Sequence, residues 1–173
     1  MTTITINHLS RVEGHGGIHV TVGPQGLERC EMEIFEGSRF YEALLVGRHF
    51  AEIPGTICRV CAICSSGHTL CALGAIEDAL EITVTPYVQS FRDLLNLGQF
   101  IESHALHLFC LAVPDYLGYS GVLEMAQYHP DVVGKALEIK RLGNAIQELV
   151  GGRAIHPVNM KIGGLGLVPA PEA

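Results

Sequence analysis

The residues best suited to chemistry lie in one short segment, TICRVCAICSSGHTLC at residues 56–71, which holds four of the six cysteines of the chain. Cys61 and Cys64 are three residues apart, so both sulfurs can reach a single metal ion. A helix N-terminus at this point would favour the thiolate form that coordination requires, and Arg59 adds a positive charge to the same effect. Thiolates select zinc, nickel, copper(I) or iron–sulfur clusters, and the spacing does not choose among them. The segment therefore predicts half of a metal site.

His68 is predicted to assist this pair. On a helix that starts near Ser65, residues 64, 68 and 71 fall at positions i, i+4 and i+7 and share one face. The ring N–H of His68 can then donate to the Cys64 sulfur, a contact that orients a metal ligand. The remaining four cysteines are predicted to be small packing residues, because buried thiols are common in protein cores: Cys30, Cys58, Cys71 and Cys110.

Two other uses of a cysteine pair fit the sequence less well. A structural zinc finger needs a second pair about 12 to 20 residues further on, and beyond the pair the chain offers only Cys71 and Cys110. A thioredoxin-like redox pair needs a preceding strand in a βαβ unit, and EIPGTI is not such a strand. The N-terminus has no basic patch followed by an apolar run, so we expect no secretory signal, a cytoplasmic location and reduced cysteines.

The composition narrows the possible partners. The chain has 173 residues, of which 48% are apolar, which is typical of a folded protein with a real core. Its net charge of -7 and the lack of a Lys/Arg cluster disfavour binding to nucleic acid or to an anionic membrane. The most apolar window, LLNLGQFIESHALHLFCLAV, holds too many polar residues for a bilayer-spanning helix. We expect no nucleic-acid partner and no membrane span.

Periodicity predicts the elements that position the cysteine segment. Alternating residues in GIHVTV and LERCEMEIFE, on either side of GPQG, predict an antiparallel β-hairpin, and the pattern becomes helical from Ser38. Further helices are predicted at about 65–80, from a Thr85 cap to a stop at Pro114, and over 130–151. The predicted fold class is α+β, mostly helical with an N-terminal antiparallel β-hairpin.

We expect residues 1–173 to form a single unit. It would comprise a hairpin region at 1–37, metal-motif helices at 38–80, long helices at 85–150 and a truncated loop at 151–173. This last segment, rich in glycine and apolar residues, is predicted to stop without a final packed element.

Several stretches, in the same order, resemble the large subunit of nickel–iron hydrogenases. ICRVCAICSSGH is similar to that family's N-terminal signature Arg-x-Cys-Gly-x-Cys-x-x-x-His, and SRVEGHGGIHVTV to its Arg-Ile-Glu-Gly-His strand. The resemblance continues through RFYEALLVGRHFAEIP, FRDLLNLGQFIESHALHLF and GGRAIHPVNMKIGG, and so covers nearly the whole chain. Among the members, the soluble cofactor- or ferredoxin-linked enzymes are the most similar. The resemblance implies that the chain is the N-terminal part of a larger hydrogenase large-subunit fold.

The resemblance also implies a reaction and roles. The reaction is the reversible splitting of H2 into protons and electrons at a centre of nickel and of iron that carries carbon monoxide and cyanide. Cys61 would be a terminal nickel ligand, Cys64 would bridge nickel and iron, and His68 would hydrogen-bond the bridging sulfur. Glu13 would relay protons, and Glu42 would bind magnesium or another hard metal. Arg59 matches the arginine of the signature, and its charge is expected to act at the catalytic site.

Two departures from the family pattern bear on the expected assembly. Ala62 stands where the family has glycine, which adds a methyl group near the pair without removing a ligand. The family's second Cys-x-x-Cys pair is absent, so a remaining large-subunit segment would have to supply it, and a small subunit would carry the iron–sulfur clusters. We therefore do not expect the chain to be active alone. The alternative is a non-catalytic scaffold, with zinc or no metal, akin to the quinone-side subunit of respiratory complex I.

Overall fold

The computed structural model describes residues 1–170, and its contacts divide the chain into two compact units, Met1–Ala43 and Leu44–Ala173. The boundary falls within helix α1, Ser38–Leu45. The two units are described separately below. Whether residues 1–173 act as the single unit expected from the sequence stays a prediction.

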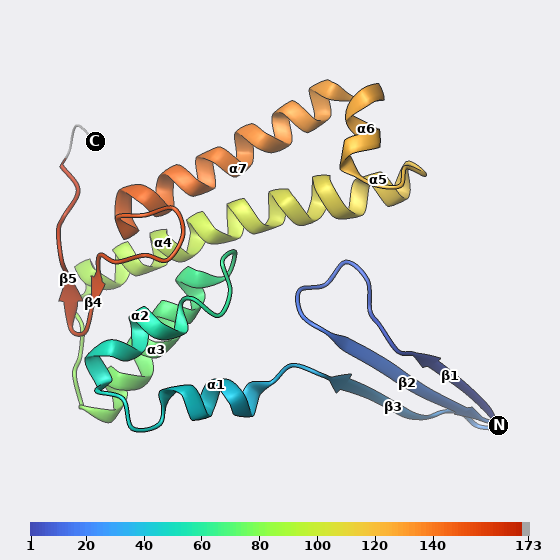
Figure 1. Ribbon diagram of the computed structural model, residues 1–173, viewed down its shortest axis with the longest axis horizontal. Helices are drawn as coiled ribbons and strands as arrows, with labels where there is room; N and C mark the ends of the chain where they lie inside the picture. The colour runs from blue at the N-terminus through green and yellow to red at the C-terminus, as the bar shows by residue number, and fades with distance from the viewer. Residues whose placement is uncertain (171–173) are drawn as a thin grey trace. The chain divides into compact units, whose positions relative to one another are not determined.

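The first unit is built around a three-stranded antiparallel sheet in the order β1-β2-β3 (Figure 1). Strands β2 (Gly16–Gly23) and β3 (Gly26–Ile34) form the predicted hairpin, and β1 (Thr2–Ile6) is a further strand that the prediction missed. The sequence TTITI did carry the alternation of such a strand. Gly17 lets β1 end close to β2, because a Cβ at this position would lie 2.8 Å from the Ile6 carbonyl oxygen.

The second unit is mostly helical. The short elements before the first long helix are the 3-10 helix η1 (Phe50–Glu52) and α2 (Ile53–Ile57). The longer helices are α3 (Ser65–Ala79), α4 (Pro86–Ala105) and α7 (Pro130–Gly151). Between α4 and α7 lie the π-helix η2 (Leu106–Ala112), α5 (Val113–Tyr116) and α6 (Val122–Tyr128). The predicted fold class, mostly helical with N-terminal antiparallel strands, is confirmed.

Helix α4 begins as predicted but does not continue as predicted. The Thr85 hydroxyl accepts a hydrogen bond from the Val88 N–H at 3.3 Å, and Pro86 occupies the first turn, where its missing N–H costs nothing. The prediction that Pro114 stops the helix is wrong. After Ala105 the path widens into the π-helix η2, and Pro114 lies in the first turn of α5, where a proline is tolerated.

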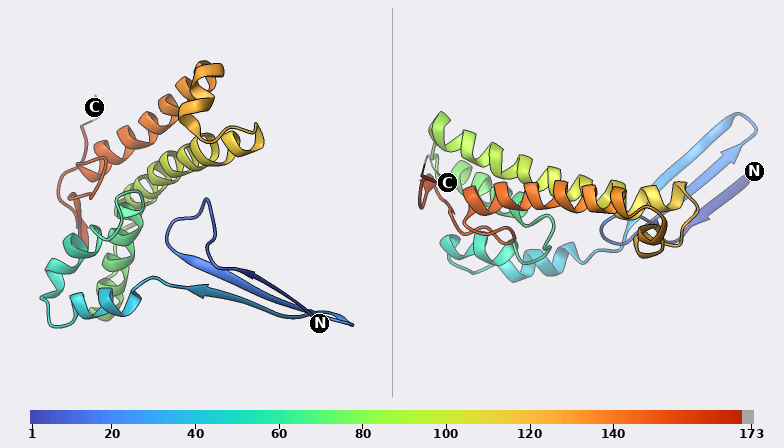
Figure 2. Two further views of the ribbon diagram at one scale, coloured as in Figure 1. Left: turned by 45° about the vertical axis from the view of Figure 1, so that its right-hand side comes forward. Right: turned by 90° about the horizontal axis from the view of Figure 1, so that it is seen from above.

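Helices α4 and α7 lie side by side in opposite directions (Figures 1 and 2). Their backbones nearly touch at a pair of glycines. A Cβ on Gly143 would lie 2.6 Å from both the Gly98 carbonyl oxygen and the Glu102 nitrogen. Any side chain at this crossing would push the helices apart, so the glycines fix how closely the two helices pack.

The end of the chain packs against this helical layer. Strands β4 (Met160–Lys161) and β5 (Gly164–Leu165) form a small antiparallel hairpin, and the expectation of a loop without a packed element is therefore wrong. Met160 joins Leu73, Leu95 and Val150 in the buried core of the unit. Among residues 1–170, no helix combines the length and the apolar character needed to cross a bilayer.

Candidate metal centre

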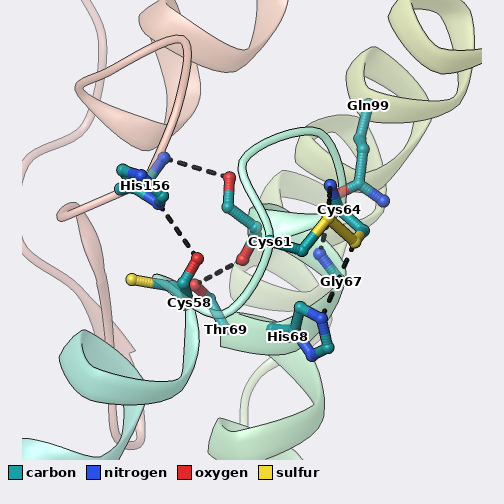
Figure 3. Close-up of a disulfide and its surroundings, with 9 residues drawn as sticks. Cys58, Cys61, Cys64, Gly67, His68, Thr69, Gln99 and His156 are labelled. Atoms are coloured by element: carbon teal, nitrogen blue, oxygen red, sulfur yellow. Dashed lines mark hydrogen bonds between the residues drawn. A yellow bond between two sulfur atoms is a disulfide. The ribbon is translucent and has the colours of Figure 1, made fainter. Parts of the chain in front are cut away.

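Cys61, Cys64 and His68 lie together at the start of α3. One Sγ atom from each cysteine and a ring nitrogen of the histidine all lie within 4.8 Å of one another, and each residue is partly buried. Within residues 1–170 this is the one group of three or more His, Cys, Asp or Glu side chains with metal-binding spacing. The Cys64 sulfur lies 3.7 Å from His68 Nε2 (Figure 3), which is the contact predicted from helix periodicity.

The two sulfurs are joined as a disulfide, with the Cα atoms 5.5 Å apart. This differs from the reduced pair expected from the sequence. The reason is geometric: the turn that lets two cysteines share one metal also brings their sulfurs to bonding distance. Only the reduced pair has thiolates to give to a metal. The Cys64 backbone N–H, 3.2 Å from the Cys61 sulfur, is placed to donate to such a thiolate.

The donor atoms of Cys61, Cys64 and His68 fit the nickel and iron that the family resemblance of the sequence implies. Two sulfurs with an imidazole suit a soft or borderline ion such as nickel, iron(II) or zinc and not a hard cation. The pair is open to further ligands, because it contributes only two of the positions that a tetrahedral or larger coordination shell needs. The residues present therefore fit part of a thiolate-rich centre.

The loop that carries the pair is held by the far end of the chain. His156 donates its backbone N–H to the Ser65 hydroxyl at 3.0 Å, and its Nδ1 lies 2.9 Å from the Cys58 carbonyl oxygen (Figure 3). The Thr69 hydroxyl donates to the Ser65 carbonyl at 2.8 Å. His156 has a left-handed backbone, φ 58°, a conformation that costs on the order of 1 kcal/mol or more for a residue other than glycine and that these contacts sustain.

The Arg59 side chain contacts Gly55 and Cys58. The guanidinium donates to the Gly55 carbonyl and lies 3.7 Å from the Cys58 sulfur. Arg59 and Cys58 line a cavity of about 480 Å³ together with His156 and Lys161. Arg59 is thus close to the pair in the sequence, but the contacts of its positive charge are with Gly55 and Cys58. The catalytic role of Arg59 stays a prediction.

Glu13 and Glu42 belong to the first unit, while the pair and His68 belong to the second. Glu13 is exposed and lines a small cavity of about 150 Å³ beside Gly14 and His15. Glu42 is exposed on α1, where Arg39 donates to its carboxylate at 2.6 Å. This hydrogen bond engages Oε2, one of the two Glu42 carboxylate oxygens. The proton relay at Glu13 and the metal site at Glu42 both stay predictions.

The other four cysteines differ from one another. Cys58 is 1% exposed, which confirms it as a packing residue, and partial burial raises the pKa of the Cys110 thiol. Cys30 and Cys71 are exposed, so the prediction that they pack is wrong for these two. All nine residues of β3, which carries Cys30, are exposed, and alternation along a strand does not show whether either face is covered.

Comparison with known proteins identifies the family of the chain. Residues 39–134 match the family described as nickel-dependent hydrogenase. Sulfhydrogenase 1 subunit alpha of Pyrococcus furiosus is 41% identical over 166 residues, which are 96% of this chain and 39% of that protein. Sulfhydrogenase 2 subunit alpha of the same organism is 42% identical over 169 residues, or 98% and 41%. The chain spans about 40% of the length of the relatives it matches.

The fold agrees with these matches. A solved structure of an NAD+-reducing NiFe hydrogenase in its H2-reduced state superposes with a TM-score of 0.80 and 29% identity, over 99% of this chain and 40% of that one. The NiFeSe hydrogenase of Desulfomicrobium baculatum gives a TM-score of 0.75 and 25% identity. The family match covers more than half of the chain, and it includes the cysteine segment whose geometry is described above. The chain belongs to the nickel-dependent hydrogenase family.

Proposed function

We propose that this chain supplies the N-terminal cysteine pair of a nickel–iron centre that converts H2 into two protons and two electrons, reversibly. One observation carries the proposal: Cys61, Cys64 and His68 present their donor atoms within 4.8 Å of one another, in a chain of the nickel-dependent hydrogenase family. When bound, the metals supply Lewis acidity toward H2 and exchange of electrons.

The pair and His68 have distinct tasks in this proposal. Cys61 would hold nickel as a terminal ligand, and Cys64 would hold both nickel and the iron, which would carry carbon monoxide and cyanide. The support for Cys64 as a ligand is that it begins α3, where the helix N-terminus stabilises a thiolate. His68 lies 3.7 Å from the Cys64 sulfur and so can orient it by donating its Nε2–H. A thiolate of the pair is the first proton acceptor.

The two carboxylates complete the chemistry on this chain. Glu13 would pass the proton outward, a task for which a carboxylate is suited. Glu42 would offer a carboxylate oxygen to magnesium, a hard cation that prefers oxygen ligands. Arg59 adds positive charge near the pair and favours its deprotonation.

The partners follow from what the chain lacks. A remaining large-subunit segment supplies the second Cys pair, because two thiolates do not complete the centre. A small subunit with iron–sulfur clusters carries the electrons, and we infer that the complex acts in the cytoplasm. The alternative of a non-catalytic scaffold is not favoured, because the relatives and solved structures that match are named as hydrogenases.

Metal analysis of the assembled complex tests the proposal. Wild-type complex is expected to contain nickel, to contain one iron per nickel beyond the iron of the small subunit's clusters, and to oxidise H2. Cys64→Ser should lose nickel and reduce H2 oxidation by at least 100-fold, since an alcohol does not bridge two soft metals as a thiolate does, a change of about 3 kcal/mol in the barrier. Cys71→Ser is the matched control, because this exposed cysteine lies two turns further along the same helix. Zinc in place of nickel, or full activity of Cys64→Ser, would refute the proposal.

A further inference from the structure

Helix α3 begins at Cys64, a proposed metal ligand, and the first backbone N–H groups of the helix need hydrogen-bond acceptors. Its N-cap is Cys64, whose side chain makes no capping hydrogen bond within the described chain. The first N–H groups of a helix need acceptors, and an N-cap side chain ordinarily accepts from the third residue of the helix. The Cys64 sulfur makes no such bond in this structure, so the acceptor comes from another residue.

Gln99 of α4 provides that acceptor. Its Oε1 atom accepts from the N–H of Gly67, the third residue of α3, at 2.9 Å (Figure 3). Gln99 is only 7% exposed. A Cβ at residue 67 would lie 3.3 Å from Gln99 Nε2, so glycine leaves room for this close approach. The cap of α3 is thus contributed by a different helix, 32 residues further along the chain.

A second hydrogen bond joins the first turn of α3 to α7. The buried Ser66 hydroxyl donates to Gln147 Oε1 at 2.8 Å, and Gln147 Nε2 donates to Glu102 Oε2 at 2.7 Å. Lys140 Nζ lies 3.0 Å from the other Glu102 oxygen and balances its charge. Asn144, with its amide nitrogen turned to the carboxylate, donates to both Glu102 oxygens and accepts from Lys140.

These groups are buried, so the loss of any one of these hydrogen bonds is costly. Ser66, Gln147 and Glu102 are 0%, 1% and 3% exposed. A buried polar group that loses its partner costs about 1–3 kcal/mol, so the start of α3 cannot shift without penalties at several places. The chain of contacts holds the helix and does not conduct protons, because the amide of Gln147 in its middle keeps its hydrogens.

We propose that Gln99, Gln147 and Glu102 are positioning residues that set where α3 begins, and thereby set the geometry of Cys64 Sγ and His68 Nε2 at the metal. The presence of the metal in this inference rests on the proposed function, whereas the positioning rests on the hydrogen bonds described above. The glycine crossing of α4 and α7 places the three together, since Gln99 follows Gly98 and Gln147 lies one turn after Gly143.

The test compares variants of the assembled complex by two measurements: hydrogen–deuterium exchange over residues 65–68 and the paramagnetic resonance spectrum of nickel. Gln99→Leu removes the acceptor, so exchange at Gly67 should speed up about tenfold and the nickel spectrum should shift or broaden. Gln99→Glu keeps an oxygen at the same place and should restore both. Gln89→Leu, an exposed glutamine on the same helix, should change neither.

Ser66→Ala is a milder second variant, which breaks only the tie to Gln147 and should act in the same direction. Wild-type exchange at Gly67 in Gln99→Leu, or faster exchange with an unchanged nickel spectrum, would overturn the proposal, as would a failure of Gln99→Glu to restore them. A wild-type complex without nickel would refute the proposed function instead, and the exchange at Gly67 would then still decide whether Gln99 caps α3.

Discussion

Removing the charge of Glu77 should destabilise the helical unit by about 3–5 kcal/mol, the typical cost of leaving one member of a buried ion pair uncompensated. Glu77 and Arg92 have side chains that are each 6% exposed, and Arg92 donates to both carboxylate oxygens at 2.6 Å. The Glu77 carboxylate also accepts from the Gly163 N–H at 2.7 Å, while Arg92 donates to the Lys161 carbonyl at 3.1 Å. The pair thus joins α3, α4 and the β4–β5 hairpin.

The pH dependence of this effect has a defined sign. Hydrogen bonds from Arg92, supported by the Gly163 N–H, lower the pKa of Glu77 against the opposing effect of burial. A carboxylate with a lowered folded-state pKa contributes stability above its unfolded pKa of about 4.3, and this contribution is lost as pH falls through the folded value. The difference between wild type and Glu77→Gln should therefore be full at neutral pH and shrink below about pH 4.

Thermal unfolding followed by circular dichroism measures the effect. For a chain of this size about 2–4 °C correspond to 1 kcal/mol, so Glu77→Gln should unfold roughly 10 °C lower. Glu138→Gln, on the exposed side of α7, is the matched control and should change little. Arg92→Met combined with Glu77→Gln should cost less than the two single changes added together. A loss below about 1 kcal/mol for Glu77→Gln, or simple additivity, would refute the reasoning.

Two further changes test the helix packing and capping. Gly143→Ala should destabilise the helical unit by about 1–3 kcal/mol despite alanine's better helix propensity, because its Cβ would lie 2.6 Å from the α4 backbone. Gly134→Ala is the matched control, because its Cβ would meet no atom of residues 1–170 within 4 Å. This control should be neutral or should stabilise the unit by up to about 1 kcal/mol. Equal effects in denaturant unfolding would disprove the crossing argument. Thr85→Ala should cost about 1 kcal/mol by loss of the N-cap, whereas Thr85→Ser should keep it.

The sequence predicted those features that depend on residues close together in the chain. The Thr85–Pro86 start of α4 and the approach of His68 to Cys64 both follow from helix geometry over four residues or fewer, and both are confirmed. The hairpin of β2 and β3 is equally local. In each case the interacting groups are fixed by backbone periodicity alone, so no knowledge of the tertiary fold was needed.

Features that depend on distant residues could not be predicted in this way. The bond between Ser66 and Gln147 joins positions 81 apart, and His156 contacts the cysteine loop from nearly 100 residues away. No local pattern distinguishes these side chains from other polar residues on their helices. The π-helix after Ala105 was also missed, because its sequence is as apolar and as helix-compatible as that of α4.

The cysteine motif is held in place by residues that are distant from it in the sequence. The three side chains of the candidate metal centre come from eight consecutive residues, but the groups that hold those residues come from α4, α7 and the loop before β4. A short Cys-x-x-Cys segment transplanted without these helices would keep its ligands and lose the acceptors that fix its first helical turn. The long helices are therefore part of the candidate site, and similarity to hydrogenases that extends over nearly the whole chain is what this arrangement requires.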